Sequence, residues 1–116
     1  MTKQQVTDQQ IAEQCGQKML ESDEASKSLG VSIIAIAPGQ ATIEMTIRQK
    51  MLNGHNTCHG GFLFTLADFA FAVACNSYNK IAVAASCNIN FVRPAHVGDV
   101  LHASAVESYK SGRNGI

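Results

Sequence analysis

The sequence has no tryptophan, only two prolines and few charged residues. Charged side chains make up 16% of its 116 residues, whereas ordinary soluble domains carry about 25%. Hydrophobic residues reach 46%, and a domain of this length buries a limited share of its surface when it is alone. We therefore expect another subunit to cover part of the surface.

The sequence also lacks an excess of charge of either sign, because its formal net charge is zero. Without a basic excess, it has no electrostatic footprint for a nucleic-acid backbone or an anionic membrane. No apolar run approaches the length of about 20 residues that spans a bilayer, and the polar start is no secretory signal. These absences predict a cytoplasmic protein that binds neither nucleic acid nor membrane.

The sequence also lacks the spacing of cysteine and histidine residues that is typical of metal sites. The four cysteines, at positions 15, 58, 75 and 87, include no CxxC pair and no short spacing to histidine. Structural and catalytic zinc sites usually draw on such patterns. We predict that the chain holds no metal and that its thiols are reduced.

The length predicts a single domain, residues 1–116, with a flexible start over 1–7. In the first half of the chain, the residue pattern predicts one helix and one hairpin. Over 8–22, apolar residues recur at helical spacing among Gln, Glu and Lys, which predicts a surface helix. Residues 31–37 and 41–47 are rich in β-branched side chains and flank the sequence Pro-Gly-Gln. This arrangement predicts two antiparallel strands joined by a turn.

A second helix is predicted after the polar loop 48–58. Residues 62–77 contain no glycine or proline, and Asp68 is the only charged residue among them. Both sides of this helix are mainly apolar, so we expect it to be buried nearly all round.

Strands are predicted again in the last third of the chain. Polar and apolar residues alternate over 81–92, and 99–109 reads as a second strand, followed by a turn over 111–115. Ile116 reads as the first residue of a further strand, so we expect a C-terminal strand that the sequence does not contain. A helix wrapped by an antiparallel sheet, an α+β fold, satisfies this order of elements.

Asp68 and Gly60 are the first candidates for chemistry. A carboxylate on an apolar helix is costly to bury without partners, so Asp68 either faces solvent, caps a backbone group or reacts. Gly60 lies at the expected helix start, where free N–H groups and the helix dipole suit a developing oxyanion. The alternative is that Gly60 and Gly61 only shape a tight turn.

The spacing of these two residues has a geometric consequence. The helix rises 1.5 Å per residue, so Gly60 and Asp68 lie about 12 Å apart along its axis. An oxyanion donor and a base must each come within about 3 Å of the same reacting group. One helix cannot meet both conditions, but two antiparallel copies related by a two-fold axis can.

The motif Asn53-x5-His59-Gly60-Gly61-x6-Asp68 resembles the active-site motif of hot-dog-fold acyl-CoA thioesterases of the phenylacetic-acid-degradation type. The segment from Ser86 to Pro94 and the pair Gly98-Asp99 resemble the same family. The resemblance implies a hot-dog fold, an antiparallel sheet around a long central helix. It also implies a homo-oligomer, in which a dimer is obligatory and a homotetramer is expected.

The resemblance implies roles for the motif residues. Asp68 would be the general base or nucleophile, and the Gly60 N–H would polarise the thioester carbonyl. Asn53 and His59 would orient substrate and water, and Ser86 would help to hold the water. By default, Asn53 is a turn residue, His59 a helix-start residue and Ser86 one polar position on a strand.

The resemblance implies acyl-CoA as the small-molecule partner, with phenylacetyl-CoA or a hydroxylated aryl-acetyl-CoA as the expected substrate and medium-chain fatty acyl-CoA still open. No cofactor is expected, because coenzyme A is part of the substrate. The residues expected to contact substrate or coenzyme A are Gly61, Thr65, Arg93, Lys110, Ser111, Gly112 and Arg113. The alternative for each of the basic residues is a solvated surface charge.

Two other functions stay open at this point. A hot-dog hydratase or dehydratase acting on an enoyl or hydroxyacyl thioester would pair a histidine with a carboxylate, and His59 and Asp68 are both present. A non-catalytic acyl-CoA-binding module would bind without turnover. The sequence also leaves open whether Asp68 activates water or attacks the carbonyl itself.

Overall fold

A three-stranded antiparallel sheet forms one layer of the computed structural model, which describes residues 5–116. Its strands are β1 (Ser32–Ala37), β2 (Gln40–Thr46) and β3 (Val100–Val106), and β2 lies between the other two. β1 and β2 form the predicted hairpin. Gly39 has a φ of +72° in its turn, a conformation that glycine adopts without strain.

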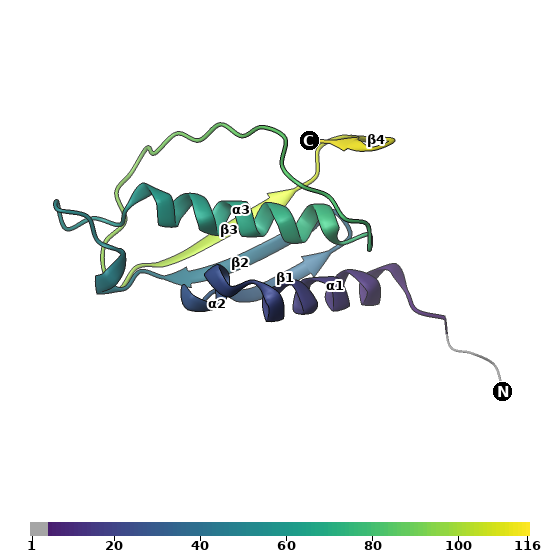
Figure 1. Cartoon of the computed structure of the whole chain (residues 1–116), viewed down its shortest axis with the longest axis horizontal. Coiled ribbons are helices and arrows are strands. Elements are labelled where there is room, and N and C mark those ends of the chain that lie inside the picture. The colour runs from purple at the N-terminus through teal and green to yellow at the C-terminus, as the bar shows by residue number, and fades with distance from the viewer. Residues whose placement is uncertain (1–4) are drawn as a thin grey trace.

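Helix α3 (Gly60–Asn76) lies across one face of this sheet, and α1 (Asp8–Ser22) lies beside it against β1 (Figure 1). The bounds of α1 confirm the predicted helix. A capping box fixes its start: the Gln10 N–H donates to Thr7 Oγ1 at 3.1 Å, and the Thr7 N–H donates to Gln10 Oε1 at 2.9 Å. The predicted flexible segment, residues 1–7, falls mainly outside the described residues.

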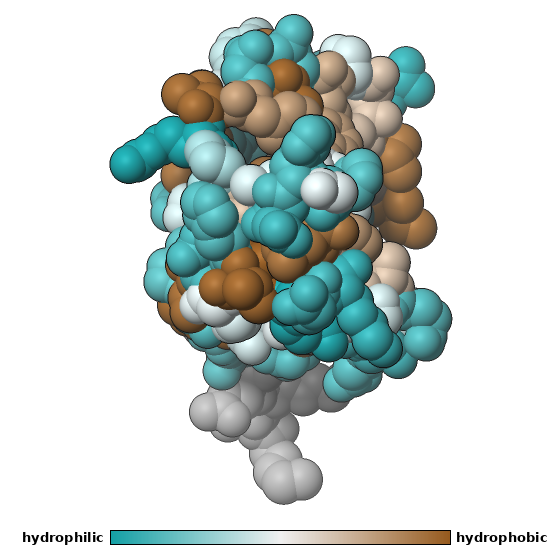
Figure 2. All heavy atoms as spheres, turned by 90° about the vertical axis from the view of Figure 1, so that its left-hand side faces the viewer, coloured by the Kyte–Doolittle hydropathy of each residue, from teal (hydrophilic) through white to brown (hydrophobic). Residues whose placement is uncertain are grey.

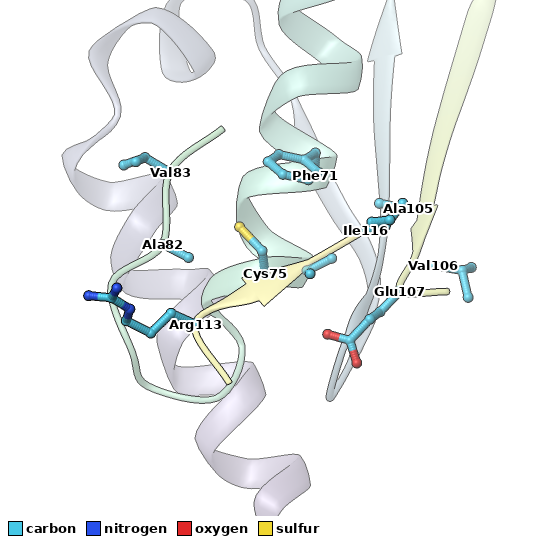
Figure 3. Close-up of a pocket in the computed structure, with 11 residues that line it drawn as sticks. Phe71, Cys75, Ala82, Val83, Ala105, Val106, Glu107, Arg113 and Ile116 are labelled. Atoms are coloured by element: carbon cyan, nitrogen blue, oxygen red, sulfur yellow. The ribbon is translucent and has the colours of Figure 1, made fainter. Parts of the chain in front are cut away.

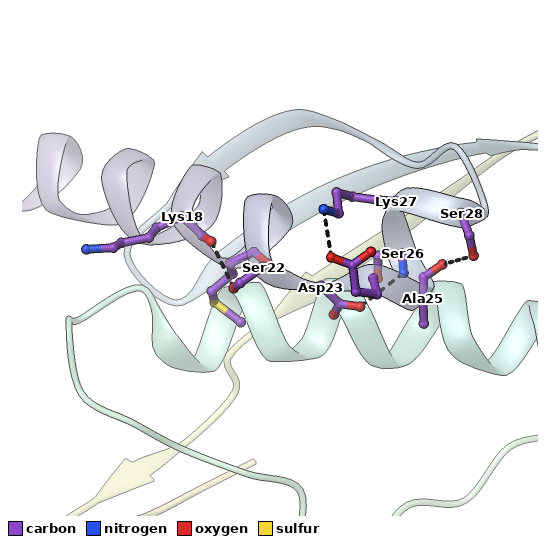
Figure 4. A network of polar contacts seen from close by, with 9 residues as sticks. Lys18, Ser22, Asp23, Ala25, Ser26, Lys27 and Ser28 are labelled. Carbon is purple, nitrogen blue, oxygen red and sulfur yellow. Dashed lines mark hydrogen bonds and ion pairs between the residues drawn. The ribbon is translucent and has the colours of Figure 1, made fainter.

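Local polar contacts turn the chain between α1 and the short helix α2 (Glu24–Ser28) (Figure 4). Asp23 ends α1 and caps α2, because its Oδ1 accepts a hydrogen bond from the Ser26 N–H at 3.0 Å. Ser22 Oγ donates to the Lys18 carbonyl at 3.1 Å in the last turn of α1. These contacts satisfy the exposed helix ends where the chain turns toward β1.

Gly16 is the point where α1 comes closest to the rest of the fold. A Cβ at this position would overlap Cδ1 of Ile36 in β1 and lie 3.4 Å from Cγ1 of Val73 in α3. Glycine in a helix interior costs about 1 kcal/mol relative to alanine. Here it allows two helices and a strand to meet.

The core lies between β2 and α3. Alternate residues of β2 are buried, and the same apolar environment continues into the 3-10 helix η1 (Gln49–Met51). The largest fully buried apolar side chains are Ile43, Met45, Ile47, Met51 and Val73. Burial of each large side chain contributes about 1.5–3 kcal/mol, so this layer holds α3 in place on the sheet.

The prediction of a strand over 81–92 is wrong. The segment forms no strand, and it runs as an arch over α3 on the side away from α1 (Figure 1). Ile81, Val83 and Val92 are 97%, 83% and 85% exposed. Within residues 5–116, β3 pairs with β2 on one edge only. The arch does not pair with the other edge of β3, so its backbone is not satisfied by a neighbouring strand, and alternation alone does not make a strand.

The chain closes with a small hairpin of β4 (Lys110–Ser111) and β5 (Asn114–Gly115). It contains the predicted turn, and Gly112 has a φ of +57° there. The Ile116 N–H donates to the Tyr109 carbonyl at 2.8 Å, which extends the pairing by one residue. The further C-terminal strand that we expected has no counterpart among the described residues.

Apolar side chains also reach the surface. Figure 2 shows them among polar side chains at the end of the molecule that holds the start of α3. None of the helices between residues 5 and 116 has the length and apolar character needed to cross a membrane.

Candidate functional site

Asp68 lies in the middle of α3 and faces a cleft of about 660 Å³ between this helix, the arch and the C-terminal hairpin. Its side chain is exposed in the isolated chain. Among residues 5–116, no group forms a hydrogen bond or ion pair with its carboxylate. The cleft wall around it is mainly apolar and includes Phe64, Phe71, Val83 and Ile89. An unpartnered carboxylate in this position is free to accept a proton from water or to attack a carbonyl.

The expectation that this helix is buried nearly all round is wrong for the single chain. Leu66, Phe69, Ala70, Val73 and Ala74 are buried against the sheet. The opposite side is open, because Gly61, Ala67 and Asp68 are exposed there. One side of the helix is therefore apolar because it packs on the sheet, and the other side is apolar where it lines the cleft.

Gly60 lies at the start of α3 in a second cleft, of about 390 Å³, together with Asn53 and Arg93. His59 is the N-cap residue, and its side chain makes no capping hydrogen bond. The Gly60 and Gly61 N–H groups have no acceptor among the described residues. These free donors at the positive end of a 17-residue helix are suited to a developing oxyanion.

Asn53 organises the loop before α3. Its Oδ1 accepts hydrogen bonds from the N–H groups of His55 at 2.9 Å and Thr57 at 3.2 Å, and its Nδ2 donates to Thr57 Oγ1 at 3.0 Å. The side chain thus does what a turn residue does, while it also lines the cleft beside Gly60. The His59 N–H donates to the Met51 carbonyl at 2.8 Å, which ties the helix start to the core.

Ser86 lines the same cleft as Asp68, as the resemblance implies. Five consecutive residues of the arch, Ala85 to Ile89, line this cleft. A two-sided strand would direct alternate residues to opposite faces, so the shared lining follows from the lack of pairing. Cys87, Asn88 and Ile89 lie in the segment that resembles the family, but they were not among the residues expected to form the site.

The residues expected to contact coenzyme A are not gathered in one place. Arg93 lines the cleft of Gly60, and Arg113 lines the cleft of Asp68. Lys110 places its Nζ 3.6 Å from the centre of the Tyr78 ring. Ser111 ends β4 and Gly112 begins the turn of the last hairpin, and both residues are exposed. On the helix, Thr65 Oγ1 donates to the Gly61 carbonyl at 2.8 Å.

A smaller cavity of about 120 Å³ adjoins the cleft of Asp68. Figure 3 shows Phe71 and Cys75 of α3 on one side of it and Ile116 on another, with Val83 of the arch nearby. Burial raises the pKa of the Cys75 thiol, and the negative charge of Asp68 acts in the same direction. The raised pKa lowers the fraction of this thiol that is ionised at a given pH.

The sheet and its long covering helix have the hot-dog fold, and Gly60 and Asp68 of the motif both lie on this helix. Residues 55–113 match the family model described as "Thioesterase superfamily". The chain belongs to this family. The recognition of a hot-dog thioesterase fold from the motif is thereby confirmed.

Individual relatives agree with this assignment. The chain is 48% identical to the Escherichia coli acyl-coenzyme A thioesterase PaaI over 98 residues, which cover 84% of this chain and 70% of that protein. It is 38% identical to a putative esterase of Archaeoglobus fulgidus, of which it spans 64%. The structure of E. coli PaaI, from the phenylacetic acid degradation operon, superposes with a TM-score of 0.92 at 45% identity, covering 94% of this chain and 79% of that one.

Proposed function

We propose that the chain is an acyl-CoA thioesterase that converts phenylacetyl-CoA, or a hydroxylated aryl-acetyl-CoA, to the free acid and coenzyme A. Membership of the thioesterase superfamily supports the reaction class. The E. coli relative is named an acyl-coenzyme A thioesterase and comes from the phenylacetic acid degradation operon. The apolar wall of the Asp68 cleft suits the aryl part of such a substrate.

The observation that carries this proposal is the placement of two reactive groups on α3. The Asp68 carboxylate has no partner among the described residues and faces a cleft that Ser86 also lines. The Gly60 amide, with no acceptor, lines a different cleft nearer the helix start. Each cleft of a single chain thus contains one half of what thioester hydrolysis needs.

Two copies of the chain complete each site. Because Gly60 and Asp68 are eight helical residues apart, or about 12 Å along the axis, they cannot act on one carbonyl. In a two-fold dimer with antiparallel α3 helices, the Gly60 amide of one copy lies opposite Asp68 of the other. A homotetramer would then be built from two such dimers. The open apolar side of α3 provides the surface for this association.

In this site, the Gly60 N–H donates to the thioester oxygen as negative charge develops on it. Asp68 either removes a proton from water, which then attacks the carbonyl, or attacks directly to form a mixed anhydride. In both routes the carbon–sulfur bond breaks, and coenzyme A leaves and takes up a proton. Water supplies the second oxygen of the acid in the direct route. In the anhydride route with water attack at the aspartyl carbonyl, Asp68 supplies that oxygen and water replaces it in the carboxylate. Ser86, Asn53 and His59 position the water and the substrate. The polarising group is an amide, so the proposed reaction requires no metal or redox cofactor.

A panel of acyl-CoA esters tests the substrate. We expect phenylacetyl-CoA or its hydroxylated form to have a kcat/KM at least about tenfold above that of octanoyl-CoA, because its aromatic ring packs against the apolar wall of the Asp68 cleft. Coenzyme A release is followed with a thiol reagent, with an enzyme blank because Cys87 is exposed. Absence of release from every ester would contradict the proposal. Hydration of crotonyl-CoA without release would instead favour a hydratase.

Oxygen-18 water distinguishes the two roles of Asp68. Under single-turnover conditions, label enters the Asp68 carboxylate only by the anhydride route, when water attacks the anhydride at the aspartyl carbonyl. The direct route places label only in the released acid. Label in the peptide that contains Asp68, detected by mass spectrometry, therefore excludes the direct route.

A further inference from the structure

Gly60 is packed against an aromatic ring from the arch. A Cβ built on Gly60 would lie 3.0 Å from Cζ of Phe91 and 3.3 Å from each of its Cε atoms. Real Cβ atoms seldom approach other atoms this closely, so a side chain at position 60 would force the ring or the helix start to move. Gly60 is not among the glycines with positive φ, and its backbone conformation does not require glycine.

The neighbouring glycines differ from Gly60 in this respect. A Cβ on Gly61 or on Gly54 would meet no heavy atom within 4 Å. Of Gly54, Gly60 and Gly61, only Gly60 has another side chain close to the position that a Cβ would occupy. The contact is therefore specific to the residue whose amide we assign to the oxyanion.

Phe91 is held close to the helix start by the backbone on both sides of the contact. The Cys58 N–H donates to the Ala95 carbonyl at 2.7 Å, and the His59 N–H donates to the Met51 carbonyl at 2.8 Å. These bonds fix the chain just after Phe91 and the chain just before Gly60. The ring is still 56% exposed, and it lines the cleft that contains Gly60.

Backbone hydrogen bonds fix the residue before the first turn of α3, but no side-chain cap holds the turn itself. His59 contributes no side-chain cap, and a helix end without a cap tends to fray. An oxyanion donor, however, is effective only when it is held within a fraction of an ångström of its place. A ring packed against the first residue of the helix supplies this restraint.

We propose that Phe91 is a positioning residue that holds the first turn of α3, and with it the Gly60 N–H, against the substrate carbonyl. On this account the glycine at position 60 is required by the Phe91 ring and not by close approach of the substrate. The inference rests on the proposed thioesterase function, because it concerns the donor of that reaction.

A double-variant experiment separates these two explanations of Gly60. The contact atoms Cζ and Cε of Phe91 are absent from leucine and present in tyrosine. Alanine at position 60 keeps the N–H and adds only a Cβ. The variants are Gly60→Ala, Phe91→Leu, Gly60→Ala/Phe91→Leu and Gly60→Ala/Phe91→Tyr, with kcat and KM measured on the best acyl-CoA of the wild type.

We expect Gly60→Ala to lower kcat by about 10²-fold, the effect of a donor displaced by about 1 Å. Phe91→Leu alone should lower kcat by about tenfold with KM within about twofold, because the turn loosens while its donor is retained. Gly60→Ala/Phe91→Leu should return to the level of Phe91→Leu. Gly60→Ala/Phe91→Tyr should stay at the level of Gly60→Ala.

Several outcomes overturn the inference. If the wild type is active and the losses of Gly60→Ala and Phe91→Leu multiply in the double variant, the glycine serves the substrate and Phe91 has no positioning role. Full activity of Gly60→Ala also overturns the inference, because glycine would then not be required at position 60, and full activity of Phe91→Leu would show that the ring positions nothing. Gly54→Ala controls for the loss of a glycine at an uncrowded position, and thermal unfolding of every variant controls for folding. A wild type inactive on every ester overturns the proposed function first, and this inference with it.

Discussion

Strand β2 and the arch, residues 81–92, differ in what surrounds them. Ile43 and Met45 of β2 are fully buried, whereas Ile81 and Val83 of the arch are almost fully exposed. β2 is hydrogen-bonded to β1 on one edge and to β3 on the other, whereas no strand pairs with the arch among the described residues. The comparison separates two tasks: β2 and its neighbours stabilise the fold, and the arch with the open side of α3 forms the clefts.

The largest expected effect is a loss of kcat, caused by a substitution in the Asp68 cleft and not by one in the core. Asp68→Asn should lower kcat by about 10²–10⁴, the usual contribution of a general base, with thermal stability unchanged because the side chain is exposed. Steady-state kinetics and thermal unfolding measure the two effects. Glu21→Asn on the exposed side of α1 is the control and should leave both unchanged. Turnover of Asp68→Asn near that of the wild type would remove Asp68 from the reaction.

Truncation of a core side chain in β2 should lower stability rather than remove a catalytic group. Ile43→Ala should reduce the free energy of unfolding by about 2–5 kcal/mol, because it leaves a cavity in the core. Val83→Ala in the arch should change it by less than about 0.5 kcal/mol. Denaturant unfolding at fixed protein concentration compares the two variants. Equal destabilisation by both would show that the arch is packed as tightly as β2.

Hydrogen exchange sharpens the same comparison without a substitution. In the arch, the Ala82 N–H donates to Asn76 Oδ1, and no acceptor is described for the amides from 83 to 92. We expect these amides to exchange at least about a thousandfold faster than those of β2, whose opening requires disruption of the core. Mass spectrometry with peptide resolution measures both regions. Equal protection would mean that the assembly pairs or covers the arch.

Cysteine reactivity gives the smallest expected difference. Burial raises the pKa of Cys58 and of Cys75, so less of each thiol is ionised at a given pH, and their alkylation should rise only at higher pH. Cys87 of the arch is exposed and should react about tenfold faster at pH 8. Peptide mapping after brief iodoacetamide treatment measures the order. Faster labelling of Cys75 than of Cys87 would contradict it.

The comparison also shows which parts of the molecule the sequence can predict. The bounds of α1 and the β1–β2 hairpin follow from local signals, namely helical spacing, a capping box and a turn between β-branched runs. The long helix was also placed within two residues of its observed bounds. A strand over 81–92 was predicted from alternation, and this failed because a strand needs a hydrogen-bonding neighbour as well as a pattern.

The candidate site could be predicted only in part, because only some of its residues lie in local sequence motifs. Asp68 and Gly60 belong to a local motif whose residue types indicate the proposed chemistry, and Ser86 begins a second segment that resembles the family. The contact between Phe91 and Gly60 depends on how the arch crosses the helix start, which no local pattern determines. For Asn53 the resemblance implies a role in orienting substrate and water, and the alternative is a turn residue; its contacts with His55 and Thr57 agree with the alternative. Its position beside Gly60 leaves room for the role that the resemblance implies.

The central claim is that each active site is completed by two copies of the chain. The most direct test mixes Gly60→Pro, which lacks the donor, with Asp68→Ala, which lacks the carboxylate. A hybrid dimer has one intact site of two, and random mixing makes half of the dimers hybrids, so we predict recovery of about a quarter of wild-type activity. Activity no greater than the sum of the separate variants, with mixed dimers demonstrated by mass spectrometry, would contradict the shared site.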